Sequence, residues 1–189
     1  MLEGILPFAR TLLRNAVQTG DAAVDATAGN GHDTLFLAEL VGENGRVYSF
    51  DIQQEAIDNT RKRLQQHGLE DRCILIRDGH ENIPSHIPQT FRGRIKGAVF
   101  NLGYLPGGDK SIVTKPETTI RAVEGLLDIL APGGIIVLVV YHGHPEGKRE
   151  RNELLPYVSQ LDQKLYHVLR YEFINQKNDP PFIIAIEKR

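Results

Sequence analysis

The chain has 189 residues, of which 41% are hydrophobic and 24% are charged, and its formal net charge is −2. This length and composition predict a single globular domain over residues 1–189, with a core that needs no disulfide to hold it. They exclude a disordered chain and a generally basic nucleic-acid-binding surface, although a local basic patch stays possible.

Three further features bear on the compartment in which the protein works. The single cysteine, Cys73, excludes an internal disulfide and fits a reducing environment. The first twenty residues lack the basic start and the cleavage site of a signal peptide, and no apolar run approaches the about 20 residues of a membrane helix. We therefore expect a cytoplasmic protein with no membrane partner.

Helix and strand signals alternate through the first 77 residues. Apolar side chains recur at helical spacing up to Val17, so residues 1–20 predict an amphipathic helix that packs on the domain and ends at Gly20. Two more helices are predicted, one from about residue 32 to 40 and one with an apolar face at residues 56–64 that ends at Gly68. Between them lie three predicted strands: Ala22–Thr27, Arg46–Asp51 and Cys73–Arg77.

The same alternation continues after a fourth predicted strand, Ile95–Leu102. The pattern Thr114-Lys-Pro-Glu117 is typical of a capping box and predicts the start of a helix that buries Leu130 in its last turn and stops at Pro132. The next segment, Ile135–Tyr141, is apolar at every position, which is typical of a central strand covered on both faces.

The end of the chain predicts one more helix and two strands. The helix begins at about Glu146 and is expected to bend or break near Pro156. The strands Tyr166–Ile174 and Phe182–Glu187 follow, joined by a turn at residues 178–181. No helix separates these two strands, so they should form an antiparallel hairpin.

This order of elements predicts an α/β fold, a Rossmann-like sheet of seven strands. Five strands should be parallel, and the hairpin should lie at one edge. That edge could pair with a second copy of the chain, so a homodimer stays possible. Ligands of such sheets bind beyond the carboxyl ends of the parallel strands, which is where candidate functional residues belong.

The first candidate is the glycine-rich turn within Asp25-Ala-Thr-Ala-Gly-Asn-Gly-His-Asp-Thr34. Gly29 and Gly31 allow a tight turn and a close approach to a ligand, and the helix that follows offers free backbone N–H groups. A dinucleotide site would have its third glycine where Thr34 stands, which argues against an NAD enzyme. A plain tight turn without a ligand is the alternative.

The next two strand ends carry carboxylates. Asp51 lies about twenty residues beyond the glycines, where a carboxylate can accept both ribose hydroxyls of an adenosine-bearing cofactor, and Gln53 is close enough to assist. Asp78 follows the third strand, with Gly79 and His80 directly after it. The alternative for each aspartate is that it caps the following helix.

The last two strand ends carry an amide, two tyrosines and two histidines. Asn101 and Tyr104 follow the fourth strand, and three residues close the fifth: Tyr141, His142 and His144. Histidine can take or give a proton near neutral pH. Two histidines with Cys73 suggest zinc, but the cysteine belongs to a distant strand and no carboxylate completes the site, so we expect no metal.

Two basic clusters could meet RNA phosphates or could simply be solvated surface. One follows the fifth strand and the other precedes the fourth; they consist of Lys148, Arg149 and Arg151, and of Arg92, Arg94 and Lys96.

Taken together, the strand-end segments resemble methyltransferase motifs. Asp25–Thr34 resembles motif I of class I S-adenosylmethionine (SAM) methyltransferases, D-x-G-x-G-x-G-x-x-T, with Thr27 in place of the first glycine. Asp78 resembles the motif III residue that binds the adenine amino group. Asn101-Leu-Gly-Tyr104 resembles the Asn-Pro-Pro-Tyr motif of enzymes that methylate amino nitrogens, with Leu-Gly in place of Pro-Pro. The resemblance implies that SAM is bound by Asp25, Thr27, Gly29, Asn30, Gly31, Asp33, Thr34, Asp51, Gln53, Asp78, Gly79, His80 and Asn101.

Over nearly its whole length the chain resembles the YtqB-like group, formerly labelled rRNA methylases and now described as MnmM. The segments that carry the resemblance are DATAGNGHDT, FNLGYLPGGDK and YHGH. It implies a tRNA methyltransferase that moves a methyl group from SAM to the aminomethyl nitrogen of 5-aminomethyl-2-thiouridine at wobble position 34. The implied products are 5-methylaminomethyl-2-thiouridine and S-adenosylhomocysteine, and the implied partner is the tRNA anticodon loop, with no DNA.

Our mechanistic hypothesis follows from this family and from the strand-end positions. Asn101 orients the amine, Tyr104 or Tyr141 stacks on the base, and His142 or His144 accepts or relays a proton. The alternatives are methylation of rRNA, methylation of a small-molecule amine, and a SAM-sensing or RNA-binding module without catalysis.

Overall fold

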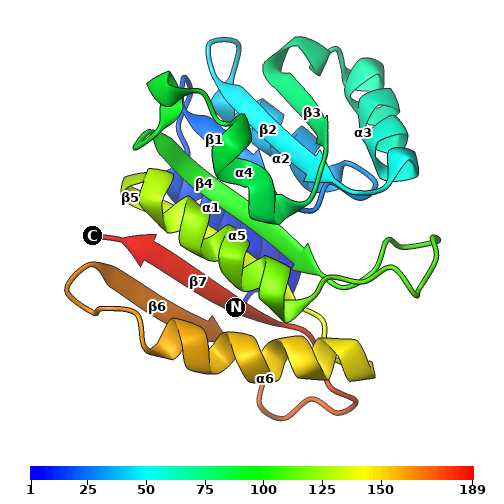
Figure 1. Ribbon diagram of the computed structural model, residues 1–189, viewed down its shortest axis with the longest axis vertical. Helices are drawn as coiled ribbons and strands as arrows, with labels where there is room; N and C mark the ends of the chain where they lie inside the picture. The colour runs from blue at the N-terminus through cyan, green and yellow to red at the C-terminus, as the bar shows by residue number, and fades with distance from the viewer.

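The centre of the molecule is one seven-stranded sheet in the order β3-β2-β1-β4-β5-β7-β6 (Figure 1). The computed structural model describes residues 1–189. Strands β1 to β5 run parallel, and β7 runs antiparallel to both β5 and β6. The predicted α/β fold, five parallel strands with an antiparallel pair at one edge, is confirmed. The strand order reverses between β1 and β4, which is the place where such sheets bind ligands.

Strands β2, β3 and β4 agree with the prediction to the residue, whereas the first helix is four residues shorter at each end than predicted, β5 begins five residues earlier, and α4 was not predicted. The strands are β1 Ala22–Asp25, β2 Arg46–Asp51, β3 Cys73–Arg77, β4 Ile95–Leu102, β5 Leu130–Val140, β6 Tyr166–Tyr171 and β7 Phe182–Lys188. The helices are α1 Ile5–Ala16, α2 His32–Val41, α3 Gln54–His67, α4 Ile83–His86, α5 Pro116–Ile129 and α6 Pro145–Ser159.

Two predictions about α5 are wrong. Thr114 does not cap the helix, because the N-cap position belongs to Lys115 and the Thr114 hydroxyl instead donates to Glu150 Oε2 at 2.7 Å. Leu130 does not lie in the last helical turn, because its backbone is already extended and pairs with Ile95 of β4. The helix therefore passes directly into β5.

Two other details differ from the predictions near the end of the chain. Helix α6 is not interrupted at Pro156, which lies in its final turn, and the helix continues to Ser159. Strand β6 ends at Tyr171, three residues earlier than predicted. The turn before β7 is confirmed by the left-handed backbone of Asn178 and Asp179, at φ 67° and 49°.

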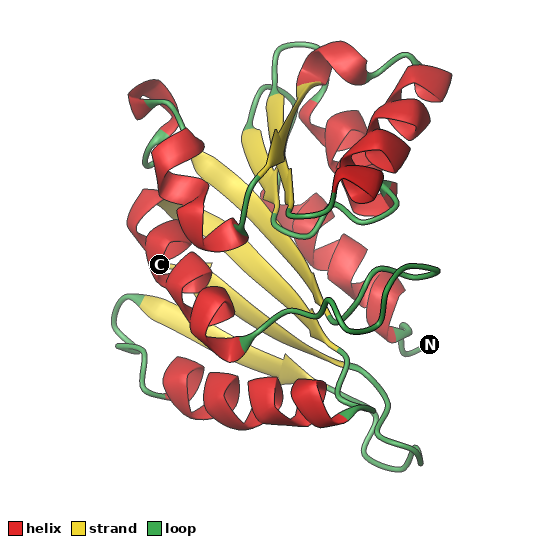
Figure 2. Cartoon of the chain, turned by 45° about the vertical axis from the view of Figure 1, so that its right-hand side comes forward, coloured by secondary structure: helices red, strands yellow, loops and turns green.

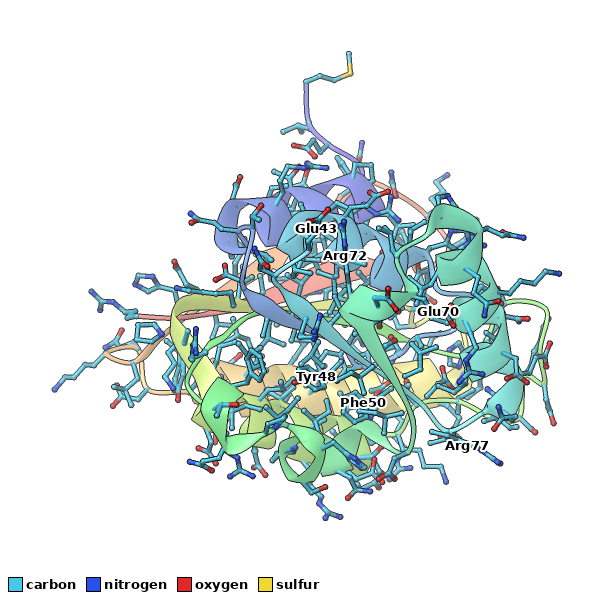
Figure 3. The ribbon with its side chains drawn as sticks, turned by 90° about the horizontal axis from the view of Figure 1, so that it is seen from above. Glu43, Tyr48, Phe50, Glu70, Arg72 and Arg77 are labelled. Carbon is cyan, nitrogen blue, oxygen red and sulfur yellow. The ribbon has the colours of Figure 1, made fainter.

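Helices cover both faces of the sheet and bury two separate cores (Figure 2). One core lies under α4, α5 and α6, and includes Tyr48 and Phe50, which point to that face of β2 (Figure 3). The other lies under α1, α2 and α3, where Leu13 and Leu37 are among the fully buried side chains. This double cover explains why Ile135–Val140 is apolar throughout.

The sheet leaves two places open. Strand β6 is one of the two edge strands of the sheet, with β3 at the other edge, and most of the β6 side chains are exposed. The carboxyl ends of β1 to β5 meet at one end of the sheet, where the loop between β4 and α5 extends beyond the strands (Figure 2). None of the helices combines the length and the apolarity that a membrane span requires.

Candidate active site

A cavity of about 1350 Å³ lies at the carboxyl ends of the five parallel strands. Its wall includes residues from α1, from every strand end and from the loop before α5. Of the predicted site residues, fourteen line it: Thr27, Gly29, Asn30, Asp33, Asp51, Gln53, Asp78, Gly79, His80, Asn101, Tyr104, Tyr141, His142 and His144. The structure therefore brings most of the predicted residues together, and the three others, Asp25, Gly31 and Thr34, lie below the floor.

Asp25 is fully buried beneath the glycine turn. Its Oδ2 accepts a hydrogen bond from the Thr34 hydroxyl at 2.7 Å, its Oδ1 accepts one from the Thr27 N–H at 3.1 Å, and the Thr34 and Ser49 hydroxyls are 2.7 Å apart. Burial, reinforced by the charge of Asp33, raises the pKa of Asp25 to about 7. Asp25 and Thr34 thus brace the turn from below and do not reach the cavity.

The glycine turn is held against α3. Gly31 is the N-cap of α2 at φ 80°, and a side chain there would place its Cβ 2.8 Å from the Thr60 backbone. The Asn30 carbonyl accepts a hydrogen bond from Arg63 Nε at 2.7 Å. Gly31 is therefore needed for the left-handed turn and for the close packing of α3, whereas Gly29 lies on the cavity wall.

Asp51 is presented to the cavity by backbone donors. The Gly29 N–H donates to its Oδ2 and the Gln53 N–H donates to its Oδ1, each at 3.0 Å. Each carboxylate oxygen keeps a second lone pair for a ligand. This geometry suits a pair of adjacent hydroxyls, such as those of a ribose, and it couples the carboxylate to the glycine turn.

Asp78 is engaged mainly within its own loop. Its Oδ1 accepts from the Gly79 N–H at 2.7 Å and from Asn82 Nδ2 at 2.9 Å, and its Oδ2 lies 2.7 Å from His86 Nε2. The hydrogen bonds from His86 and Asn82 lower the pKa of this carboxyl. The N-cap position of the turn at residues 80–82 belongs to Gly79 and has no side-chain cap, so Asp78 does not cap it, and Asp78 lines the cavity.

His80 lies against the β1 and β4 ends. Its Nδ1 is 3.3 Å from the Ala26 carbonyl, and burial lowers its pKa. The ring is therefore neutral near pH 7, and its Nδ1–H donates to that carbonyl. A neutral, mostly apolar ring at this position suits the face of a planar base.

Asn101 is oriented by a chain of polar groups that begins on α1. Its Nδ2 donates to Asp33 Oδ2 at 2.6 Å, and Asp33 Oδ1 is 3.4 Å from the Arg10 guanidinium. Its backbone N–H donates to the Thr27 hydroxyl at 2.7 Å. Because Asp33 accepts from the amide NH₂, the carbonyl oxygen Oδ1 of Asn101 is left free to accept from a ligand.

Two tyrosines stand beside Asn101 on the wall. Burial raises the pKa of the Tyr141 hydroxyl, and the charge of Asp33 adds to this effect, so Tyr141 stays protonated. Tyr104 is 39% exposed on the loop after β4, where it forms an isolated bridge with Val113. Lys110 Nζ lies 5.6 Å from the centre of the Tyr104 ring. Both rings are placed where they can contact a substrate.

The two histidines after β5 have different surroundings. His142 is buried, with Nε2 2.8 Å from the Pro180 carbonyl and Nδ1 3.0 Å from an Arg151 guanidinium nitrogen. Arginine only donates, so His142 carries its proton on Nε2 and has no free nitrogen for proton transfer. His144 instead accepts the Gly147 N–H on Nδ1 at 3.1 Å and caps α6.

The structure does not support a zinc site or either predicted basic cluster as part of this wall. Cys73 begins β3, at the other end of the sheet from His142 and His144, and no three His, Cys, Asp or Glu side chains are arranged to bind a metal ion. Lys148 pairs with Asp179 at 3.1 Å, and Arg149 pairs with Glu153 at 3.2 Å. Residues 92–96 lie at the amino end of β4, away from the cavity.

Residues of α1 were missed by the sequence reasoning. Arg10 and Arg14 line the cavity, with their guanidinium carbons 5.1 and 5.5 Å from the centre of the Phe36 ring. Their spacing of four residues on an amphipathic helix places them on one face, which is a signal that the sequence does contain. The cavity wall also includes Lys115 from the start of α5.

Comparison with known families and chains gives consistent results. Residues 47–187 match the family described as "Putative rRNA methylase". A chloroplastic tRNA (mnm(5)s(2)U34)-methyltransferase of Arabidopsis thaliana is 36% identical over 188 residues, which is 95% of this chain and 68% of the relative.

Two solved structures are similar over the full length of both chains. A putative rRNA methylase from Clostridium thermocellum superposes with a TM-score of 0.96 at 47% identity. A putative methyltransferase from Streptococcus mutans, solved in complex with SAH, superposes with a TM-score of 0.90 at 37% identity. The fold is thus shared with these methyltransferases.

Proposed function

The chain belongs to the rRNA methylase family, and from this premise we propose that it is a SAM-dependent methyltransferase of the tRNA wobble base. It N-methylates 5-aminomethyl-2-thiouridine at position 34 to 5-methylaminomethyl-2-thiouridine and releases S-adenosylhomocysteine. The relative from Arabidopsis thaliana is named a tRNA (mnm(5)s(2)U34)-methyltransferase, which supports this proposal. The observation that carries the proposal is the free carbonyl of Asn101, fixed by Asp33 at the switch point of the sheet. We also propose that the protein works in the cytoplasm.

The cofactor belongs on the side of the cavity formed by β1, β2 and β3. Asp51 accepts the two ribose hydroxyls, and the backbone around Thr27 and Gly29 faces the methionine part. His80 and the loop at Asp78 border the adenine. This arrangement is supported by the backbone donors that already hold the Asp51 carboxylate toward the cavity and by the SAH-bound relative.

The reaction forms a bond between the amine nitrogen and the methyl carbon and breaks the bond between that carbon and the sulfonium sulfur. The nitrogen must reach the carbon in line with sulfur and with its lone pair free. Asn101 Oδ1 accepts one N–H of the amine, which turns the lone pair toward the methyl group. Alignment of two bound reactants can lower a barrier by about 7–11 kcal/mol. The extra proton on the product leaves to solvent.

The acceptor side also has room and charge for RNA. A wobble base in an unpaired loop leaves its stack at small cost and can enter a pocket lined by aromatic rings. Tyr104 and Tyr141 supply those rings, and Arg10, Arg14 and Lys115 stand at the wall where phosphates would approach. A local basic rim therefore substitutes for the general positive charge that the chain lacks.

The test is methyl transfer from labelled SAM to separate tRNA and rRNA pools from cells that lack the gene, followed by nucleoside analysis. We expect label in 5-methylaminomethyl-2-thiouridine from tRNA, and label that forms about 10²–10³ times more slowly with the Asn101→Ala variant. Label in rRNA alone would establish the rRNA alternative. If neither pool is labelled although the protein still binds SAM, the substrate is a small-molecule amine and not an RNA.

A further inference from the structure

One ring nitrogen of His144 is hydrogen-bonded within the protein, and the other is not. Its Nδ1 accepts the Gly147 N–H at 3.1 Å, so the neutral ring carries its proton on Nε2. That Nε2 atom is buried and has no hydrogen-bond partner, and it is the one buried side-chain nitrogen or oxygen in the chain of which this is true. Buried donors in folded proteins are almost always paired, so an unpaired donor on a cavity wall indicates a partner in the ligand.

The nearby His142, in the same loop, has no such unpaired nitrogen. Both nitrogens of His142 are paired, to the Pro180 carbonyl and to Arg151. Only His144 therefore offers an unused group, and that group is a donor. A nitrogen that already carries its proton cannot accept another, so His144 does not act as the base that the sequence suggested.

We infer that His144 is a specificity residue, whose Nε2–H donates to the O4 carbonyl of the substrate uracil. This inference rests on the proposed function. Strands β4 and β5 are adjacent, and the Tyr141 N–H donates to the Leu102 carbonyl at 3.3 Å, so the segment with His144 begins beside Asn101. In the substrate, O4 is attached to the ring carbon next to the one that bears the aminomethyl group. Asn101 and His144 thus bind two neighbouring groups of one base.

Access to His144 passes Tyr104. The two ring centres are 5.7 Å apart with an interplanar angle of 57°, and the tyrosine is 39% exposed. The Tyr104 ring can therefore turn aside without disturbing either core. A uracil that enters beside it stacks on the ring and presents O4 to Nε2. A cytosine presents an amino group there, so two donors face each other and the base is rejected.

The experiment uses two anticodon stem–loop RNAs, with 5-aminomethyluridine or 5-aminomethylcytidine at position 34, and two variants. His144→Asn keeps an oxygen where Nδ1 caps α6 but has no group at the Nε2 position, because the side chain is shorter. His144→Gln places an amide NH₂ near that position. The full-length protein is used throughout, and kcat/KM is measured for each RNA.

We expect the wild type to prefer the uridine RNA by at least about tenfold, since a site that hydrogen-bonds a substrate group discriminates strongly against analogues without it. His144→Asn should lose most of this preference by slowing on the uridine RNA alone, and His144→Gln should keep it. Equal slowing of His144→Asn on both RNAs would overturn the inference, as would a wild type without preference. A wild type that methylates neither RNA would instead overturn the proposed function, and the inference with it.

Discussion

The two halves of the cavity are built on different principles. In the half formed by β1, β2 and β3, the carboxylates of Asp25, Asp51 and Asp78 are all held by hydrogen bonds from within the chain. In the half formed by β4 and β5, Asn101 Oδ1 and His144 Nε2 have no partner. The first half is a finished surface, and the second is left open for a ligand to complete.

This difference follows from what each half does in the proposed reaction. A cofactor that is the same in every cycle is bound well by groups that are fixed in advance, because nothing then needs to reorganise. A substrate that must be recognised and aligned needs groups whose hydrogen-bonding capacity is unused until it arrives. An unpaired buried group costs about 1–3 kcal/mol, which a matching substrate relieves and a wrong one does not.

The largest expected effect is at Asn101. Asn101→Ala removes the carbonyl that accepts the amine N–H, and loss of one such orienting group typically reduces kcat by about 10²–10³. Because this group belongs to the open half, the Kd for SAM should change less than about threefold, as measured by calorimetry. If SAM binding falls as far as turnover, Asn101 belongs to the cofactor and the division between the halves is wrong.

The matching change in the finished half is Asp51→Ala. It removes an acceptor for both ribose hydroxyls and also frees the Gly29 and Gln53 N–H groups. Two charge-assisted hydrogen bonds are lost, so the Kd for SAM should rise by about 100-fold. At saturating SAM, the KM for tRNA should stay near the wild-type value. A large rise in that KM would mean that Asp51 also shapes the acceptor half.

The variant Asp25→Asn tests whether Asp25 stabilises the glycine turn without binding the cofactor. The raised pKa of about 7 means that folded Asp25 retains its proton up to near neutral pH, so its contribution to stability is full in acid and is lost as the pH rises through 7. An asparagine is isosteric and does not titrate. Its amide can donate to Thr34, which then donates to Ser49.

Urea unfolding at pH 5 and pH 8 measures this change. The stability of Asp25→Asn relative to the wild type should rise by about 2–3 kcal/mol between the two values, since each pKa unit is worth about 1.4 kcal/mol. The Kd for SAM should be unchanged, because the side chain does not reach the cavity. A variant with wild-type stability at both pH values but weaker SAM binding would show that Asp25 contacts the cofactor.

The finished half is the one whose residues stand in plain sequence patterns, although three of them, Asp25, Gly31 and Thr34, do not line the cavity. Its residues follow one another in a short motif at the first turn, Asp51 ends β2, and Asp78 follows β3, and the patterns of both strands are plain. The open half draws on α1, on the loop before α5 and on the end of β5, which no local pattern connects. The coupling of Arg10 to Asn101 through Asp33, and the unpaired Nε2 of His144, depend on tertiary contacts that residue spacing does not encode.

Asp33 is the residue that crosses this division. It belongs to the glycine-rich motif by sequence, yet its carboxylate accepts from Asn101 Nδ2 at 2.6 Å and faces Arg10 of α1. Asp33→Ala should let the Asn101 amide rotate, so that its oxygen points correctly only part of the time. We expect kcat to fall by about tenfold, less than in Asn101→Ala, because the carbonyl is still present.

In the double variant the Asp33→Ala change should have little further effect, since two residues that act through one contact are not additive. Full additivity, or a loss of SAM affinity equal to the loss of kcat, would return Asp33 to the cofactor half, where its place in the motif had put it.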